Sequence, residues 1–212
     1  MNYDGPSSGM EAELAVRALE SLSKEYDIHG VTLISDGDST LYARLRDELD
    51  WTIIKHECTN HLIKNYKSNL YQLKSHKDFG GILSELIINK ICAYTRNVIN
   101  LYGGVSGRDE LKMKALVSQV PHHIFGYHKN CTEEMCKRDK DDANGDKRLS
   151  SHHFKTLSTC SNNIIFKVSR IYKGTTSNLA ECYHSIRAKI DHGKVRNYIQ
   201  RGSFQLRSYW AA

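Results

Sequence analysis

The stretch VTLISDGDST, residues 31–40, decides the fold class of this chain. Its first five residues form a run rich in β-branched side chains that is too short for a helix and typical of a buried strand in a parallel sheet. Asp36 follows the run directly, at the position where open α/β sheets carry the groups that contact ligands. The stretch therefore predicts a parallel strand with an acid at its carboxyl end. The alternative is a plain turn, in which Gly37 bends the chain and Asp38 caps the next helix.

The sequence around this strand alternates helical and extended patterns. Apolar residues at helical spacing predict a helix over about residues 9–26 and another around residues 41–49, and residues 51–55 predict a second strand. Strands that alternate with helices imply a mainly parallel sheet with right-handed crossovers. The first quarter of the chain is therefore expected to be an α/β unit.

The remainder of the chain has mainly helical patterns. Helical spacing continues from residue 61 to about residue 101, and a further helix is predicted over about residues 109–120, ending before Pro121. Residues 129–148 are dense in charge and predict an exposed loop. The last helix is predicted over residues 177–190, with an inner side made by Cys182, Tyr183, Ile186 and Ile190.

Length and composition narrow the class of protein. The chain has 212 residues, 40% of them hydrophobic and 25% charged, which suits one soluble domain or one domain with a helical insertion. No apolar run approaches the ~18 residues of a membrane span, and the first residues lack the apolar core of a signal peptide, so we expect a nuclear or cytoplasmic protein without membrane contact. In that compartment the six cysteines are expected to be thiols or metal ligands. The net charge of +6 is compatible with a polyanionic partner and does not require one.

A second acid, Glu181, lies in TTSNLAECYHS, residues 175–185, at the start of the last predicted helix. Two carboxylates brought together from distant segments can form a divalent-metal site for phosphate chemistry. We therefore predict that Asp36 and Glu181 approach to within ~10 Å at the carboxyl edge of the sheet, the limit for sharing such a site. The alternative is that Glu181 only pairs with Asn178, which has the spacing of a helix N-cap.

Two groups of Cys and His have the spacing of metal ligands. Cys58-x2-His61 is half a zinc site, and a buried cysteine beside a hydrogen-bonded histidine is the more common outcome. His128-x2-Cys131-x4-Cys136 is the stronger pattern, because three soft ligands fall within nine positions of a loop with few apolar residues. It predicts a structural zinc site whose fourth ligand comes from His152, His153, Cys160 or the Cys58 pair. Cys92 and Cys182 lie on apolar helical faces and are predicted to be core residues.

The order of the motifs GPSSGMEAELA, SDGDS, ECTNH, H-x2-C-x4-C and SNLAE resembles the catalytic domain of Mutator-like DDE transposases, most closely the arthropod type. The resemblance implies an α/β, ribonuclease H-like fold with a partial parallel or mixed sheet and a helical insertion. It implies a partial core over residues 1–75, a helical insertion with the Cys/His loop over residues 76–160, and a helix with the last acid and a basic tail over residues 161–212.

Within this resemblance Asp36 matches the second acid of the triad, Glu181 the last, and Cys58 with His61 the C-x2-H signature. The family's first acid lies upstream of the GPSSG segment, so the resemblance implies an N-terminally truncated domain. In intact relatives it implies cleavage of a DNA strand and transfer of its 3′ hydroxyl to target DNA by two Mg²⁺ ions held by three carboxylates. With one acid missing, we expect the chain alone to be inactive.

The alternative function is a non-catalytic DNA- or protein-binding module that derives from a transposase and keeps the Cys/His loop. The partners expected are DNA and, in an oligomer, other transposase chains. Basic residues of the C-terminal stretch could contact DNA phosphates or form a solvated surface, and they are Arg187, Lys189, Lys194, Arg196, Arg201 and Arg207.

Overall fold

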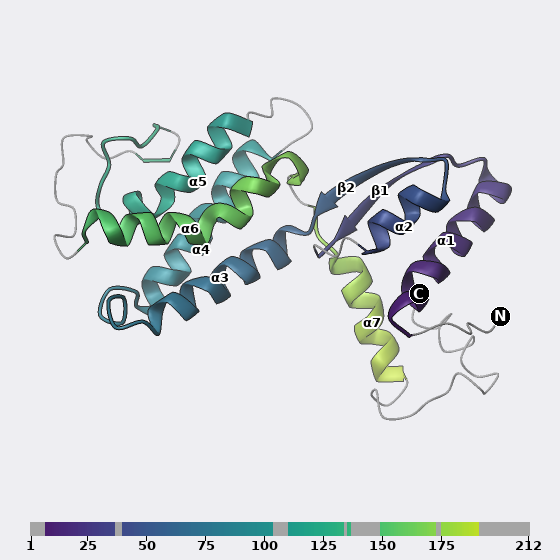
Figure 1. Cartoon of the computed structure of the whole chain (residues 1–212), viewed down its shortest axis with the longest axis horizontal. Helices are drawn as coiled ribbons and strands as arrows, with labels where there is room; N and C mark the ends of the chain where they lie inside the picture. Colours follow the sequence, from purple (N-terminus) through teal and green to yellow (C-terminus); the bar gives the residue numbers. More distant parts are fainter. Residues whose placement is uncertain are drawn as a thin grey trace. The chain divides into compact units, whose positions relative to one another are not determined.

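A computed structural model describes residues 7–36, 40–103, 110–133, 135–136, 149–172 and 175–190 of the chain (Figure 1). The chain divides into two compact units, Met1–Thr175 and Thr176–Ala212, and each is described by itself. The structure is a mixed α/β fold that is mostly helical and has a small parallel sheet. None of the helices in the described ranges is long and apolar enough to cross a membrane.

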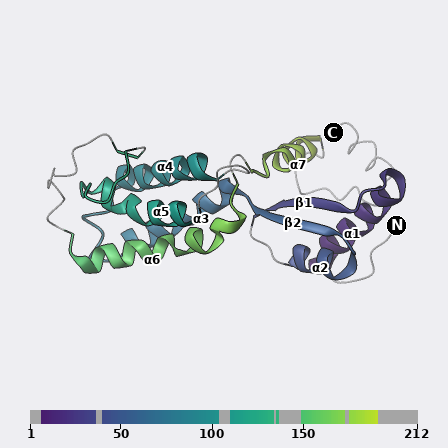
Figure 2. The ribbon, with the colours of Figure 1, turned by 90° about the horizontal axis from the view of Figure 1, so that it is seen from above.

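The first unit begins with the expected alternation of helix and strand. Its elements are α1 (Ser7–Tyr26), β1 (Gly30–Ser35), α2 (Thr40–Glu48) and β2 (Thr52–Glu57). The two strands lie side by side and run parallel, with Gly30 paired to Thr52 and Ser35 paired to Glu57 (Figures 1 and 2). The α2 helix makes the crossover between them, as the sequence predicted. The predicted cap Asp38 lies outside the described residues.

The sheet is covered on one face. Val16 of α1 and Leu45 of α2 are buried in a small core against which Leu33 and Ile53 pack from the strands. On the opposite face Ile54 is 50% exposed. In β1 the residues alternate between exposed and half-buried, so the prediction of a buried strand was wrong for this described strand.

The second part of this unit is a helical bundle with its own hydrophobic core. Its elements are α3 (Thr59–Lys74), α4 (Glu85–Tyr102), α5 (Glu110–Ile124), α6 (Ser151–Lys167) and the short 3-10 helix η1 (Val168–Arg170). Figures 1 and 2 show the four long helices packed together. Buried apolar side chains from every helix form one continuous core, among them Leu70, Ile88, Ile91, Cys92, Met113, Leu157 and Ile164. The prediction for Cys92 is thus confirmed, while the predicted boundaries at residues 75 and 160 stay predictions.

The α5 helix does not end before Pro121, as the sequence predicted, but continues to Ile124 with Pro121 inside it. A proline removes one hydrogen bond, which a buried ring near the end of a helix can offset by packing. The chain turns away from the helix at Gly126, which lies two residues past Ile124 and has a φ of 86°, in the left-handed region. There Tyr127 N–H donates to the His122 carbonyl at 2.9 Å and Gly126 N–H donates to the His123 carbonyl at 3.1 Å, the Schellman arrangement.

The second unit contributes one described helix, α7 (Asn178–Ile190). Tyr183 and Ile190 are half-buried. Cys182 is exposed and Ile186 is 39% exposed, so the prediction of a common inner side that includes them was wrong. Helical periodicity identifies an apolar face, but the face becomes buried only where another element packs on it.

Candidate functional site

The carboxyl ends of β1 and β2 lie at the same edge of the sheet. Asp36 follows β1 directly, as the sequence predicted, and its side chain is exposed. Beside it, Cys58 N–H donates to the Ser35 carbonyl at 2.8 Å, which extends the pairing of the two strands by one bond. The edge therefore brings the segment of Asp36 against the start of the HECTNH motif.

Glu57, the last residue of β2, is a buried carboxylate that sequence reasoning did not single out. Only 3% of the residue is exposed. One carboxylate oxygen accepts from Lys167 Nζ at 3.0 Å, and the other lies 3.5 Å from the Arg170 guanidinium. Because these partners follow about 110 positions later, no local pattern in the sequence could have paired them with Glu57.

The chain after η1 returns to the same strand end. The Tyr172 ring stacks on His56 with centroids 3.8 Å apart. The Thr175 hydroxyl donates to the Glu57 carbonyl at 3.1 Å, and Thr59 N–H donates to the Thr175 carbonyl at 3.0 Å. Thr175, the last residue of the first unit, is therefore hydrogen-bonded through its hydroxyl and its carbonyl to the β2–α3 junction. Ser177, which precedes α7, follows it by two positions.

Glu181 lies in the first turn of α7 and is exposed. The helix begins at Asn178, so the residue in front of the helix is Ser177 rather than the predicted cap Asn178. The Ser177 hydroxyl donates to the Glu181 carboxylate at 2.6 Å, and Glu181 N–H donates to the Ser177 carbonyl. Since Asp36 and Glu181 belong to different units, their approach stays a prediction.

Cys58 and His61 lie at the start of α3. Cys58 is the N-terminal flanking residue of the helix and is 1% exposed, and His61 is half-buried in the first turn. Their possible ligand atoms lie within 4.8 Å of each other. The two residues are close enough to coordinate one ion, although a pair supplies only half of the ligands of a tetrahedral zinc site.

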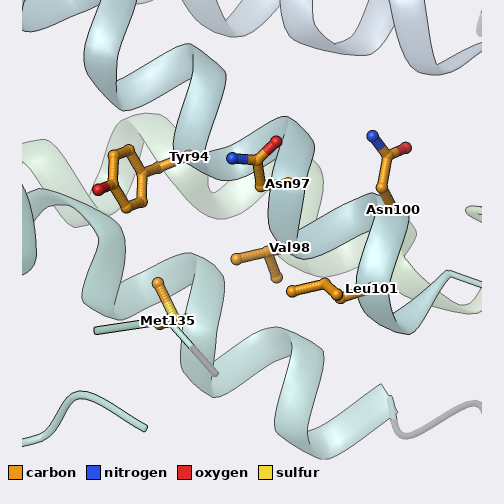
Figure 3. Close-up of a pocket in the computed structure, with 6 residues that line it drawn as sticks. All are labelled: Tyr94, Asn97, Val98, Asn100, Leu101 and Met135. Atoms are coloured by element: carbon orange, nitrogen blue, oxygen red, sulfur yellow. The ribbon is translucent and has the colours of Figure 1, made fainter. Parts of the chain in front are cut away.

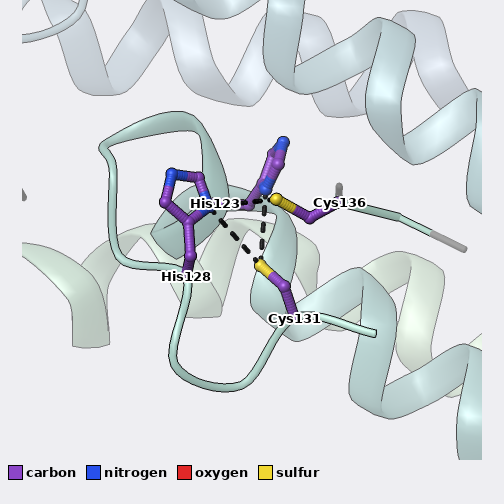
Figure 4. A group of neighbouring side chains, drawn as sticks. All are labelled: His123, His128, Cys131 and Cys136. Carbon is purple, nitrogen blue, oxygen red and sulfur yellow. Dashed lines mark hydrogen bonds between the residues drawn. The ribbon is translucent and has the colours of Figure 1, made fainter. Parts of the chain in front are cut away.

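The structure brings His128, Cys131 and Cys136 together, as their spacing predicted, and adds His123 (Figure 4). The ligand atoms of all four residues lie within 4.8 Å of one another. We call these four residues the Cys/His cluster. His128 and Cys131 are buried and Cys136 is half-buried, so this part of the predicted exposed loop is folded against the bundle. Residues 137–148 of that loop lie outside the described residues.

None of the residues predicted to complete the site belongs to the Cys/His cluster. His153 bonds through Nδ1 to the N–H of Ser150 at 3.0 Å and so caps α6. His152 is exposed on the same helix. Cys160 is half-buried, and its burial raises the pKa of its thiol. The observed fourth member, His123, stands in the last turn of α5, five positions before His128, so the longer spacing H-x4-H-x2-C-x4-C was the available signal.

Contacts within the Cys/His cluster are made by Nδ1 atoms. His123 Nδ1 lies 3.3 Å from the Cys131 sulfur, and His128 Nδ1 lies 3.4 Å from the Cys136 sulfur and 3.8 Å from the Cys131 sulfur. The Tyr94 ring of α4 packs on the His123 ring, with centroids 4.7 Å apart. Two sulfur and two imidazole ligands form a donor set that could bind a metal such as zinc.

Two hollows lie along α4 near the Cys/His cluster. One, of about 420 Å³, borders His123, His128 and Cys136. The other, of about 310 Å³, is lined by Tyr94, Asn97, Val98, Asn100, Leu101 and Met135, and Figure 3 shows the Met135 side chain directed toward α4. Met135 lines both hollows, so the short segment that carries Cys136 also forms their shared wall.

The family model described as Mutator-like transposase matches residues 1–136. The chain belongs to the Mutator-like transposase family. Neither the curated proteins nor the solved structures gave a significant match. The range shared with Mutator-like transposases includes Asp36, the HECTNH motif and all of the Cys/His cluster, whereas Glu181 lies beyond it.

Proposed function

We propose that this chain is a Mutator-like transposase-derived domain with a ribonuclease H-like fold of the DDE type, which binds DNA and carries part of a strand-cleavage site. The observation that carries the proposal is Asp36 at the carboxyl end of a parallel strand in a chain of this family. Open α/β sheets bind ligands at that edge. A net charge of +6 adds a long-range attraction for nucleic acid.

Chain connectivity supports Glu181 as the partner of Asp36. Thr175 is bonded to the β2–α3 junction, beside the strand that leads to Asp36. Only Thr176 and Ser177 separate Thr175 from α7, and Glu181 lies in the first turn of that helix. A trans chain spans at most ~3.6 Å per residue, so this linker is short. The hydrogen bond from Ser177 holds the Glu181 carboxylate near the helix start, where the helix dipole favours negative charge.

The metal that we propose for Asp36 and Glu181 is Mg²⁺, which prefers carboxylate oxygens and fits the donor set of two exposed acids. In a complete three-carboxylate site, such ions would supply activation of the attacking oxygen and stabilisation of the leaving oxygen of the DNA strand. Asp36 and Glu181 would hold the ion, and the hydrogen bond from Ser177 would orient the Glu181 carboxylate. The 212 residues offer two of the three carboxylates that the family resemblance implies, so we propose that the chain alone does not cleave DNA.

The metal that we propose for the Cys/His cluster is zinc, in a structural role separate from DNA cleavage. Two thiols and two imidazoles suit zinc and are poor ligands for Mg²⁺. We further propose a nuclear location and assembly with other transposase chains on DNA, which follow from the family and not from any contact within the described residues.

A plasmid-nicking assay tests the proposed inactivity. The purified chain should leave supercoiled DNA intact in Mg²⁺ and in Mn²⁺, because two carboxylates do not assemble the two-metal centre that strand cleavage needs. Its binding to duplex DNA should weaken steeply as salt rises, since phosphate contacts act through counterion release. Nicking that disappears in both Asp36→Asn and Glu181→Gln, and persists in the matched surface variant Asp47→Asn, would show that a third ligand lies within the chain.

A second measurement tests the pairing of the two acids. Fe²⁺ substituted for Mg²⁺ generates radicals that cut the polypeptide near the ion, and we expect cuts near both residue 36 and residue 181. Asp36→Asn and Glu181→Gln should each abolish both sets of cuts, because the two residues hold one ion. If each variant removed only the cuts at its own position, the shared site would be refuted. Salt-sensitive DNA binding without any shared ion would favour the non-catalytic binding module.

A further inference from the structure

The Cys/His cluster has the dimensions of a closed tetrahedral centre. We infer that its zinc is held by four protein ligands, with His123 as the fourth and with both histidines coordinating through Nδ1. This inference rests on the proposal that the cluster binds zinc. It adds a residue that lies in a helix, outside the loop that carries the other three ligands.

The sulfur to nitrogen distances support tetrahedral coordination. Zinc bonds of ~2.3 Å to sulfur and ~2.05 Å to nitrogen at the tetrahedral angle place sulfur and nitrogen about 3.5 Å apart. The three contacts in the structure measure 3.3, 3.4 and 3.8 Å. The same geometry places two sulfurs about 3.8 Å apart, and no pair in the Cys/His cluster exceeds 4.8 Å. Two nitrogens would lie about 3.3 Å apart in the same geometry, so closing around an ion needs a contraction of about 1.5 Å at most in any pair.

Hydrogen bonding alone gives a poor account of these contacts. His128 Nδ1 lies within contact distance of two thiols, at 3.4 and 3.8 Å. A neutral imidazole nitrogen carries either one proton or one lone pair, so Nδ1 can serve one of these thiols well. An ion at the centre interacts with all four groups at once.

Backbone hydrogen bonds and ring packing fix the positions of the ligands. His123 is fixed by the end of α5, where the left-handed Gly126 turns the chain back, and by the Tyr94 ring that packs on it. Cys131 N–H donates to the His128 carbonyl at 2.9 Å, and Cys136 N–H donates to the Thr132 carbonyl at 3.0 Å. Turns therefore set the spacing of the loop ligands.

Charge balance explains why such a centre can lie among buried and half-buried residues. Zinc with two thiolates and two neutral imidazoles carries no net charge, so enclosing it avoids the large penalty for an unpaired buried ion. With four protein ligands the centre has no open position for water, which makes it structural rather than catalytic. Its effect is to join the last turn of α5 to the segment 128–136.

Zinc analysis of the full chain and of ligand variants tests the inference. Native mass spectrometry should show one zinc per wild-type chain, and Cys131→Ser and Cys136→Ser should lose it. His123→Ala should weaken zinc binding at least ~100-fold in competition with a chelator, more than the loss of an outer partner of a ligand. The matched controls His152→Ala and Cys160→Ser lie outside the Cys/His cluster and should bind zinc as the wild type does.

Cobalt substitution reports the coordination directly. Co²⁺ in the wild type should give the intense visible absorption of a tetrahedral site with two thiolates, and His123→Ala should lose intensity as water enters. His123→Cys should restore four protein ligands and strengthen the sulfur charge-transfer band, which also decides the case if His123→Ala fails to fold.

Two failures can be told apart. If wild type and Cys131→Ser both lack zinc, the proposed metal is wrong and the inference fails with it. If the cysteine variants lose zinc while His123→Ala keeps wild-type affinity and spectrum, zinc stands and His123 is not a ligand.

Discussion

The ion pair between Glu57 and Lys167 should be a major stabilising contact of the first unit. Glu57 is 3% exposed, and its carboxylate accepts from Lys167 Nζ at 3.0 Å. Lys167→Met removes the ammonium but keeps most of the apolar stem, so the variant isolates the charge. The carboxylate would then stay buried with Arg170 alone, at 3.5 Å.

The expected loss of stability is about 2 kcal/mol. Breaking a buried pair by removing one partner typically costs ~3 to 5 kcal/mol, because the remaining charge is left uncompensated. Here Arg170 remains, and the Lys167 side chain is 27% exposed, so solvent screens part of the interaction and the value falls below that range. For a chain of this size about 2 kcal/mol corresponds to a fall in Tm of about 4 to 8 °C.

Urea and thermal unfolding, followed by circular dichroism, would measure the effect. Glu57→Gln and the double variant complete a double-mutant cycle, and we expect a coupling energy of about 1 to 2 kcal/mol because the double variant leaves no buried charge. Asp47→Asn breaks the exposed pair with Arg46 and serves as the control, with little change expected. If Lys167→Met unfolded like Asp47→Asn, with no coupling to Glu57, the assigned role of this contact would be refuted.

Two further predictions concern the helical core. Tyr66→Phe should lower the free energy of unfolding in urea by about 1 to 3 kcal/mol, because the hydroxyl of buried Ser161 loses its partner at 3.0 Å. Adding Ser161→Ala should recover part of this free energy, because no buried hydroxyl is then left without a partner. Equal stability of the single and double variants would contradict this. Burial lowers the pKa of His122 below its ordinary value of 6.5, so the unfolded chain takes up a proton first as pH falls through 6.5. The free energy of unfolding should therefore decline as pH falls from about 6.5 to the pKa of His122 in the folded chain, and then level off. His122→Phe keeps a ring against Phe154, and its free energy of unfolding should decline less over that window. Parallel curves of unfolding free energy against pH for the two proteins would contradict this.

Local patterns predicted the elements of the fold. The run before Asp36 predicted β1, and periodic apolar residues predicted helices close to those observed, because both signals come from neighbours in the chain. The Cys/His spacing also predicted correctly that His128, Cys131 and Cys136 come together, since nine positions leave the backbone few ways to separate them.

Packing between distant segments decided the rest. Pro121 stays inside α5 because the bundle buries its ring, and Cys182 is exposed where the helical pattern predicted core. The residue that completes the Cys/His cluster is His123, which reaches it through the turn at Gly126, whereas the partners of Glu57 lie at the end of α6 and in η1, after the other long helices of the bundle in the sequence. Spacing within a segment is set by backbone geometry and can be read from sequence, but a contact across about 110 residues depends on how the helices pack.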